Sequence, residues 1–159
     1  MQRKPTKSRA APMFAAATDA LRCRRSRVER VRGLYALTPD LDDTALLLGK
    51  VAAALEGGAM AIQYRNKHAA ASLRQTQALA LARLHAARGA LYVVNDDPAL
   101  AASVGADGVH LGEDDGSIVS ARELLGPDRI IGVSCYNDLE RASAAVEAGA
   151  DYEIGRAHV

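Results

Sequence analysis

The chain has 159 residues, enough for one domain with a sizeable core, and its 49% hydrophobic and 25% charged residues are typical of a globular protein. It contains no apolar run long enough to span a bilayer, so no membrane partner is expected. The formal net charge of +1 conceals an asymmetry, because residues 1–30 carry nine Lys or Arg and two acidic residues, whereas residues 31–159 carry eleven and seventeen.

Residues 1–30 are predicted to be a basic, disordered or mistranslated extension rather than part of the fold. An organelle transit peptide or a nucleic-acid contact is the alternative for such an arginine-rich start. The segment lacks interleaved aromatic residues and any known binding module, so no nucleic-acid partner is expected. The two cysteines, Cys23 and Cys135, form no metal-binding pattern and are typical of a reducing compartment, which favours a cytoplasmic location.

From residue 31 onward, short apolar strands alternate with amphipathic helices. Strands are predicted at residues 33–38, 59–64, 91–94, 108–111 and 130–135, helices at 43–56, 71–87, 118–125 and 138–148, and a further helix that begins at Pro98. Asp97 and Pro98 are predicted as the N-cap and first residue of the third helix, and a sixth strand is expected near Tyr152. Five successive βα units indicate a parallel α/β fold, and the pattern alone allows a doubly wound sheet or a (β/α)8 barrel.

The second strand ends in the sequence Gln63-Tyr-Arg-Asn-Lys67. Alternate side chains of an extended chain share a face, so Gln63, Arg65 and Lys67 are predicted to project together. Two cations at the mouth of an apolar sheet favour an anionic partner, because Arg provides a planar fork for phosphate oxygens and Lys a compact charge. A solvated strand end with a chance alternation is the alternative.

Carboxylates follow the third and fourth strands, where Asn95 and Asp96 end one strand and Gly112 to Asp115 follow the other. Ligands of parallel α/β sheets bind at the carboxyl ends of the strands. Mg2+ usually takes one or two carboxylates together with water and substrate phosphates, which suits Asp96 and Asp115. Glu113 and Asp114 compete with Asp115 for this role on spacing alone. Helix-capping or solvated carboxylates are the alternative to a metal site.

Two further polar residues lie on the predicted strands. His110 is interpreted as a structural residue, since a single His within a strand is more often structural than catalytic. Ser134 ends the fifth strand at the same edge as the cations and carboxylates, but no His/Asp pairing marks it as a nucleophile. The convergence of cations, carboxylates, an amide and a hydroxyl on one edge predicts a Mg-diphosphate site.

These motifs resemble those of the thiamine-phosphate synthase family. The similarity rests on Gln63-x-Arg65-x-Lys67, Asn95-Asp96, residues 105–112 with Asp115, and Ile131-Gly-Val-Ser134, and it runs from residue 33 to 151. It implies a TIM (β/α)8 barrel, of which residues 31–152 would form the first five βα units and the start of the sixth strand.

The resemblance also implies a transferase activity in thiamine biosynthesis. Members join hydroxymethylpyrimidine diphosphate to thiazole phosphate, giving thiamine phosphate and pyrophosphate, so the expected partners are these small molecules. Gln63, Arg65, Lys67, Asn95 and Ser134 would bind the pyrimidine diphosphate, with Arg65, Lys67 and Ser134 also serving catalysis, and Asp96 and Asp115 would bind Mg2+. The sequence gives no indication of oligomeric state.

Two departures from the family pattern stand out. Glu113 replaces a Gln that is usual beside the metal-binding Asp, which adds a negative charge near the site. Residues 153–159 match none of the family's next segment and are predicted to be a foreign or out-of-frame tail. The chain is therefore expected to be a fragment with impaired activity. The alternatives are a thiazole tautomerase-like relative and a non-catalytic phosphate-binding fragment.

Overall fold

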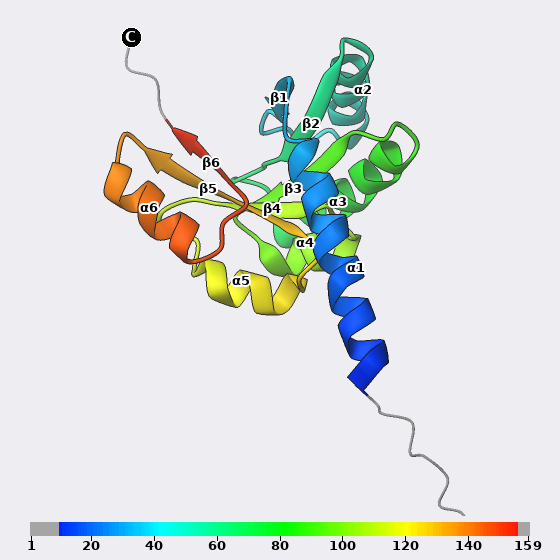
Figure 1. The fold of residues 1–159 in the computed structure, drawn as a ribbon. Helices are drawn as coiled ribbons and strands as arrows, with labels where there is room; N and C mark the ends of the chain where they lie inside the picture. Colours follow the sequence, from blue (N-terminus) through cyan, green and yellow to red (C-terminus); the bar gives the residue numbers. More distant parts are fainter. Residues whose placement is uncertain (1–9, 156–159) are drawn as a thin grey trace, which may run out of the picture.

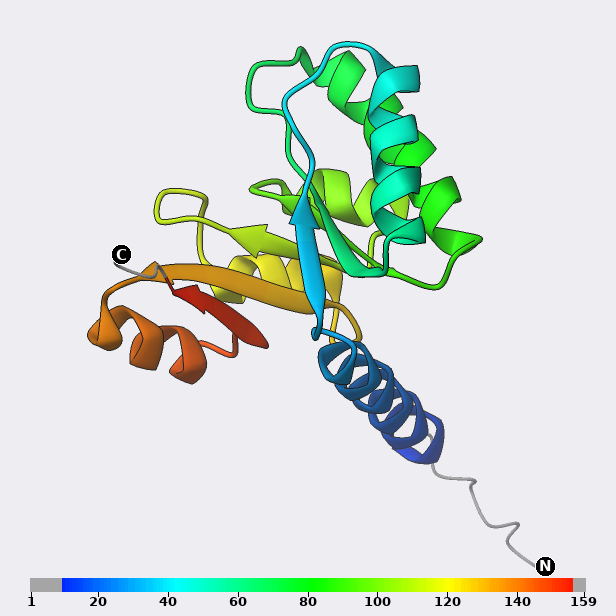
Figure 2. The same cartoon turned by 90° about the horizontal axis from the view of Figure 1, so that it is seen from above.

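The protein is described by a computed structural model that covers residues 10–155, with side chains from residue 17. Six parallel strands form one curved sheet in the order β1-β2-β3-β4-β5-β6 (Figures 1 and 2). The strands are β1 (Leu34–Leu37), β2 (Ala59–Tyr64), β3 (Leu91–Asn95), β4 (Gly108–Leu111), β5 (Ile130–Tyr136) and β6 (Tyr152–Gly155). The helices are α1 (Ala10–Glu29), α2 (Thr44–Glu56), α3 (Ala71–Ala86), α4 (Pro98–Val104), α5 (Ile118–Leu125) and α6 (Leu139–Glu147).

The strict alternation of strand and helix from β1 to β6 places each strand next to its successor in the sheet. Every pairing is parallel, and the connecting helices cover the outer side of the sheet. This arrangement confirms the predicted partial (β/α) barrel of five complete units and a sixth strand, and it excludes the doubly wound alternative, in which the strand order would reverse.

Local residues cap the ends of α2 and α4, and the N-cap predicted at Asp97 is confirmed. Asp43 and Asp97 are the N-caps of α2 and α4, and their side chains accept hydrogen bonds from backbone N–H groups three residues on. Pro98 occupies the first turn of α4, and Gly105 ends that helix in the left-handed conformation, with a φ of 70°. Local sequence therefore fixes the length of these helices.

The curved sheet has an apolar core on each face. The outer core lies between the sheet and helices α2 to α5 and includes Leu47, Ile62, Leu81 and Val109. The inner core is smaller and contains Ala61, Leu91, Val93 and Ile130. Side chains alternate along a strand, so every second residue after these apolar ones also lies on the inner face. Toward the strand tips, the residues at these positions are polar.

The first and last strands meet through side chains across the inner face. The hydroxyl oxygens of Tyr35 and Tyr152 lie 3.0 Å apart, and their ring centroids are separated by 6.1 Å. Gly132 makes room for this contact, since a Cβ atom there would lie 2.1 Å from Cζ of Tyr152. The two tyrosines therefore fill the centre of the curved sheet.

Two Gly-Ala-Asp turns, 105–107 and 149–151, join a helix to the next strand in the same way. The Asp107 side chain accepts a hydrogen bond from the backbone of Tyr92, and the Asp151 side chain accepts one from Ile131. The backbone N–H of each Asp donates to the same strand residue. Each turn thereby fixes the start of the strand that follows it against the neighbouring strand of the sheet.

Residues 10–29 form helix α1, so the predicted disorder of segment 1–30 is wrong for this part; residues 1–9 lie outside the described residues. The C-terminal half of α1 contacts the amino end of the sheet, whereas its first half projects away from it (Figure 2). Arg24 pairs with Asp151 at 3.3 Å, and Arg27 with Asp107 at 3.0 Å. Local sequence could not reveal partners more than 75 residues away.

The boundary predicted after residue 152 is also corrected. Residues 153–155 belong to β6 and pair with β5, while residues 156–159 of the predicted tail lie outside the described part. Strand pairing is made by backbone hydrogen bonds, which an atypical sequence can still form. Among residues 10–155, we find no helix whose length and hydropathy would let it cross a membrane.

Gly108→Ala is expected to destabilise the protein by about 1–3 kcal/mol, because the added Cβ cannot avoid a backbone atom. An ideal Cβ at this position would lie 2.1 Å from the carbonyl oxygen of Ile130 on the neighbouring strand. Gly49→Ala is the matched control in helix α2, where no atom lies within 4 Å of the new Cβ. It should stabilise the protein by about 0.5–1 kcal/mol. Urea unfolding of both variants measures the difference, and equal effects would contradict this packing.

Candidate functional site

A cavity of about 380 Å³ opens at the carboxyl end of the sheet. It contains residues from all six strand tips, as expected for a parallel α/β sheet. Its walls are Leu37, Gln63, Arg65, Lys67, Asn95, Asp96, His110, Gly112, Glu113, Asp114, Asp115, Ser134, Tyr136 and Ile154. Every site residue predicted from the sequence is among them.

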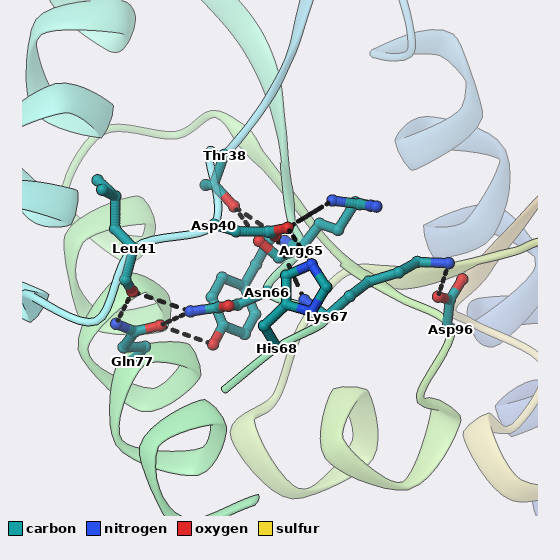
Figure 3. Close-up of polar contacts among 10 residues, drawn as sticks. Thr38, Asp40, Leu41, Arg65, Asn66, Lys67, His68, Gln77 and Asp96 are labelled. Carbon is teal, nitrogen blue, oxygen red and sulfur yellow. Dashed lines mark hydrogen bonds and ion pairs between the residues drawn. The ribbon is translucent and has the colours of Figure 1, made fainter. Parts of the chain in front are cut away.

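Gln63, Arg65 and Lys67 share one face at the tip of β2, as the alternation predicted. Gln63 is buried, and its Nε2 has no hydrogen-bond partner among the described residues. Lys67 Nζ lies 3.3 Å from Asp96 Oδ2 (Figure 3). The tip therefore presents one buried amide and two cations to the cavity.

Asp40, between β1 and α2, was not singled out as a site residue from the sequence. Both of its carboxylate oxygens accept hydrogen bonds from Arg65 Nη1 at 3.1 Å (Figure 3). Thr38 Oγ1 donates to the carbonyl oxygen of Arg65 and accepts from its backbone N–H, each at 2.9 Å. This segment fixes both the backbone and the guanidinium of Arg65, through contacts 25–27 residues apart in sequence.

A buried amide network holds the other face of the β2 tip. Asn66 Nδ2 donates to the Leu41 carbonyl at 2.9 Å and to Gln77 Oε1 at 3.1 Å, and Tyr64 Oη donates to the same Gln77 oxygen at 2.9 Å (Figure 3). Gln77 Nε2 in turn donates to the Leu41 carbonyl at 2.8 Å. Because Asn66 is anchored away from the cavity, its two neighbours Arg65 and Lys67 turn toward it.

The structure distinguishes the candidate carboxylates. A Cβ atom built on Gly112 would lie 2.5 Å from Asp115 Oδ2 and 3.9 Å from Asp96 Oδ1, so these two carboxylates converge on the space beside a glycine. Glu113 instead pairs with Arg141 at 3.1 Å, and Asp114 is exposed. Asp96 and Asp115 therefore form the facing pair.

Burial raises the pKa of Asp96, and the adjacent Asp115 raises it further through a hydrogen bond and charge repulsion, whereas Lys67 lowers it. Two carboxylates that disfavour each other's charge are suited to a shared cation. Within residues 10–155, three or more His, Cys, Asp or Glu side chains nowhere gather into a metal-binding cluster. The pair fits Mg2+, which needs only one or two carboxylates when phosphate and water complete its shell.

His110 lies beside Ser134, with its Nε2 atom 2.9 Å from Ser134 Oγ. The sequence gave no sign of this contact, because the two residues lie on different strands. Burial lowers the pKa of His110 to about 4, so the ring is neutral near pH 7. Its Nδ1 has no partner among the described residues, so the carboxylate of a catalytic triad is missing there. His110 thus contacts Ser134 and lines the cavity, and its interpretation as a structural residue stays a prediction.

Backbone strain is concentrated at this cavity. Among the described residues, Asp96 and Tyr136 are the non-glycine residues with positive φ, at 63° and 52°, and both line the cavity. Such conformations are tolerated by Asp but are unusual for a bulky residue, and they are typical of functional sites. Tyr136 had no distinguishing signal in the sequence, since its conformation follows from an irregularity in the β5–β6 register.

Comparisons with known proteins agree with this geometry. A family model described as thiamine monophosphate synthase matches residues 34–157, which extends past the predicted end at residue 152. The chain is 58% identical over 123 residues to thiamine-phosphate synthase of Chromobacterium violaceum and 54% identical over 125 residues to that of Xanthomonas campestris pv. campestris strain 8004. These alignments cover 77% and 79% of this chain, but 59% and 60% of the two relatives.

Among solved structures, the chain is similar to a thiamine phosphate pyrophosphorylase from Pyrococcus furiosus. The TM-score is 0.70 and the sequence identity 38%, over 80% of this chain and 61% of that chain. The chain thus spans about three fifths of the length of the relatives that it matches.

Asp96→Asn is expected to stabilise the ligand-free protein at pH 7 while removing its response to Mg2+. The pKa of Asp96 is higher in the folded chain than in the unfolded chain. At a pH between these two pKa values, the folded chain therefore binds more protons than the unfolded chain does. The free energy of unfolding of the wild type should therefore rise as the pH falls into that window, and less so in the variant. Thermal unfolding with and without MgCl2 tests this, since a cation bound only by the folded state raises Tm. An equal Mg2+ response of both proteins would contradict the paired-carboxylate site.

Proposed function

The chain belongs to the thiamine monophosphate synthase family, and from this membership we propose that it takes part in the coupling of hydroxymethylpyrimidine diphosphate to thiazole phosphate, with release of pyrophosphate. The observation that carries the proposal is the convergence of two cations and two carboxylates, from the ends of β2, β3 and β4, on one cavity. This set of groups suits a diphosphate with a divalent cation better than it suits a neutral ligand.

Arg65 and Lys67 would bind the diphosphate. Asp40 holds the Arg65 guanidinium through one nitrogen, Nη1, which leaves its other donors for phosphate oxygens. Lys67 Nζ lies 3.3 Å from Asp96 Oδ2, so a diphosphate bound by Lys67 would lie beside both the ammonium group and the carboxylate pair. Asp96 and Asp115 would hold Mg2+, which neutralises the charge that develops on the leaving group.

The proposed step breaks the bond between the pyrimidine methylene carbon and the diphosphate oxygen, and the electron pair leaves with pyrophosphate. The thiazole nitrogen then gives its lone pair to the methylene carbon, forming the new C–N bond without a proton transfer. This chemistry needs fixed positive charge at the leaving group and alignment of the two rings rather than a strong base. A neutral His110 and a serine without a triad agree with that requirement.

Gln63, Asn95 and Ser134 would orient the pyrimidine ring. All three lie on the inner face of the sheet, one each at the tips of β2, β3 and β5. The unpartnered Nε2 of Gln63 is a buried donor that gains a partner when a ligand with an acceptor nitrogen or oxygen binds. We also propose a cytoplasmic location for this reaction, which the two free cysteines support.

Arg65→Gln and Lys67→Gln should each weaken binding of Mg-pyrophosphate at least about tenfold, because a charge-assisted contact contributes roughly 1.5–3 kcal/mol. Arg88→Gln is the matched control. It breaks the 3.3 Å ion pair between Arg88 and Glu56, and neither of these residues lines the cavity. Isothermal titration of pyrophosphate at saturating MgCl2 gives the affinities. A wild-type chain that does not bind Mg-pyrophosphate would refute the proposed function.

A further inference from the structure

Arg141 of helix α6 joins the end of β5 to the β4–α5 loop at the rim of the cavity. Its Nε donates to the carbonyl oxygen of Ser134 at 2.9 Å, and its Nη1 lies 3.1 Å from Glu113 Oε1 in the β4–α5 loop. Its guanidinium carbon also lies 5.8 Å from the ring centroid of Tyr136, within the range of a cation–π contact. Arg141 thus contacts Ser134 and Tyr136 at the end of β5, and Glu113 in the loop after β4.

The two partners of this ion pair differ in exposure. The Arg141 side chain retains 22% of its accessible surface, whereas the Glu113 side chain retains 63%. Arg141 is fixed by the β5 backbone and the tyrosine ring, so it is the anchored partner, and Glu113 is the group that it holds. Arg is suited to this because its planar fork presents donors in several fixed directions, which Lys does not.

The loop that Arg141 holds carries Asp115. Residues 112–117 include two glycines and three adjacent acidic residues, whose like charges disfavour a compact conformation. Inside the loop, Asp115 Oδ2 accepts a hydrogen bond of 2.8 Å from the backbone N–H of Gly112. The ion pair from Glu113 to Arg141 attaches the outer side of the same loop to α6.

We propose that Arg141 is a positioning residue that holds the β4–α5 loop through Glu113, so that Asp115 faces Asp96. The inference rests on the proposed function, because it assigns the pair a role in binding the cation and diphosphate. It also explains how Glu113 is accommodated beside the carboxylate pair, since its ion pair with Arg141 offsets its charge. Contacts around a metal ligand of this kind influence metal affinity strongly.

A double-mutant cycle on binding tests the proposal. We expect Arg141→Gln and Glu113→Ala each to raise the Mg2+ concentration needed for half-maximal pyrophosphate binding about tenfold. The double variant should show the same shift of about tenfold rather than about a hundredfold, because both changes remove the same Arg141–Glu113 ion pair, through which the loop is held. Pyrophosphate affinity at saturating Mg2+ should stay near that of the wild type, which a general loss of structure would not allow. Arg88→Gln and Glu56→Ala, which break an ion pair away from the cavity, form the control cycle.

Amide hydrogen exchange, measured without ligand, tests the role of Arg141 in the loop independently of the proposed function. The Gly112 amide donates to Asp115, so Arg141→Gln should reduce its protection while the amides of β2 and β3 keep theirs. Failure of the wild type to bind Mg-pyrophosphate would remove the proposed function and, with it, the role of Arg141 in cation binding. Unchanged Gly112 protection in Arg141→Gln, or single effects that multiply in the double variant, would overturn the inference even if the wild type binds.

Discussion

The inner face of the curved sheet is the constraint on which the rest of the molecule depends. Alternate residues of every strand point to this face, and they must fill a narrow space shared by all six strands. Toward the amino end it is filled by Ala61, Leu91, Val93 and Ile130, and at its centre by the tyrosine pair of β1 and β6. These side chains fill the inner face up to its centre, so the cavity lies beyond them, at the carboxyl ends of the same strands.

Aspartate residues lie at both ends of the sheet, but they have different partners at the two ends. At the amino end, Asp107 and Asp151 have arginine partners and accept backbone hydrogen bonds, so their charge is compensated within the protein. At the carboxyl end, Asp96 lies beside Asp115, with Lys67 as its cationic neighbour. The same residue type stabilises the fold at one end and remains available for a ligand at the other.

The cavity combines features that each oppose stability. A carboxylate with a raised pKa, a tyrosine with positive φ and a buried amide without a partner all occur around one space. Such features persist where the surrounding structure holds them in place. Here the supporting contacts are the Gln77 network beneath the β2 tip, the Asp40 contact to Arg65, and the contacts of Arg141 to the β4–α5 loop and the end of β5.

From residue 31 onward, the sequence by itself determined the order of strands and helices, the N-cap of α4, and the face on which Gln63, Arg65 and Lys67 lie, because periodicity and capping depend on neighbours within a few residues. It also located the carboxyl-end site, since the strand tips of a parallel sheet meet at one edge. Spacing alone left Asp115, Glu113 and Asp114 as alternatives, and the tertiary structure shows that Asp115 faces Asp96 and that α1 packs against the sheet. It alone brought Asp40 to Arg65, His110 to Ser134 and Arg141 to Glu113. These contacts join residues on different elements, and their pairing is set by strand register and packing, which local sequence does not encode.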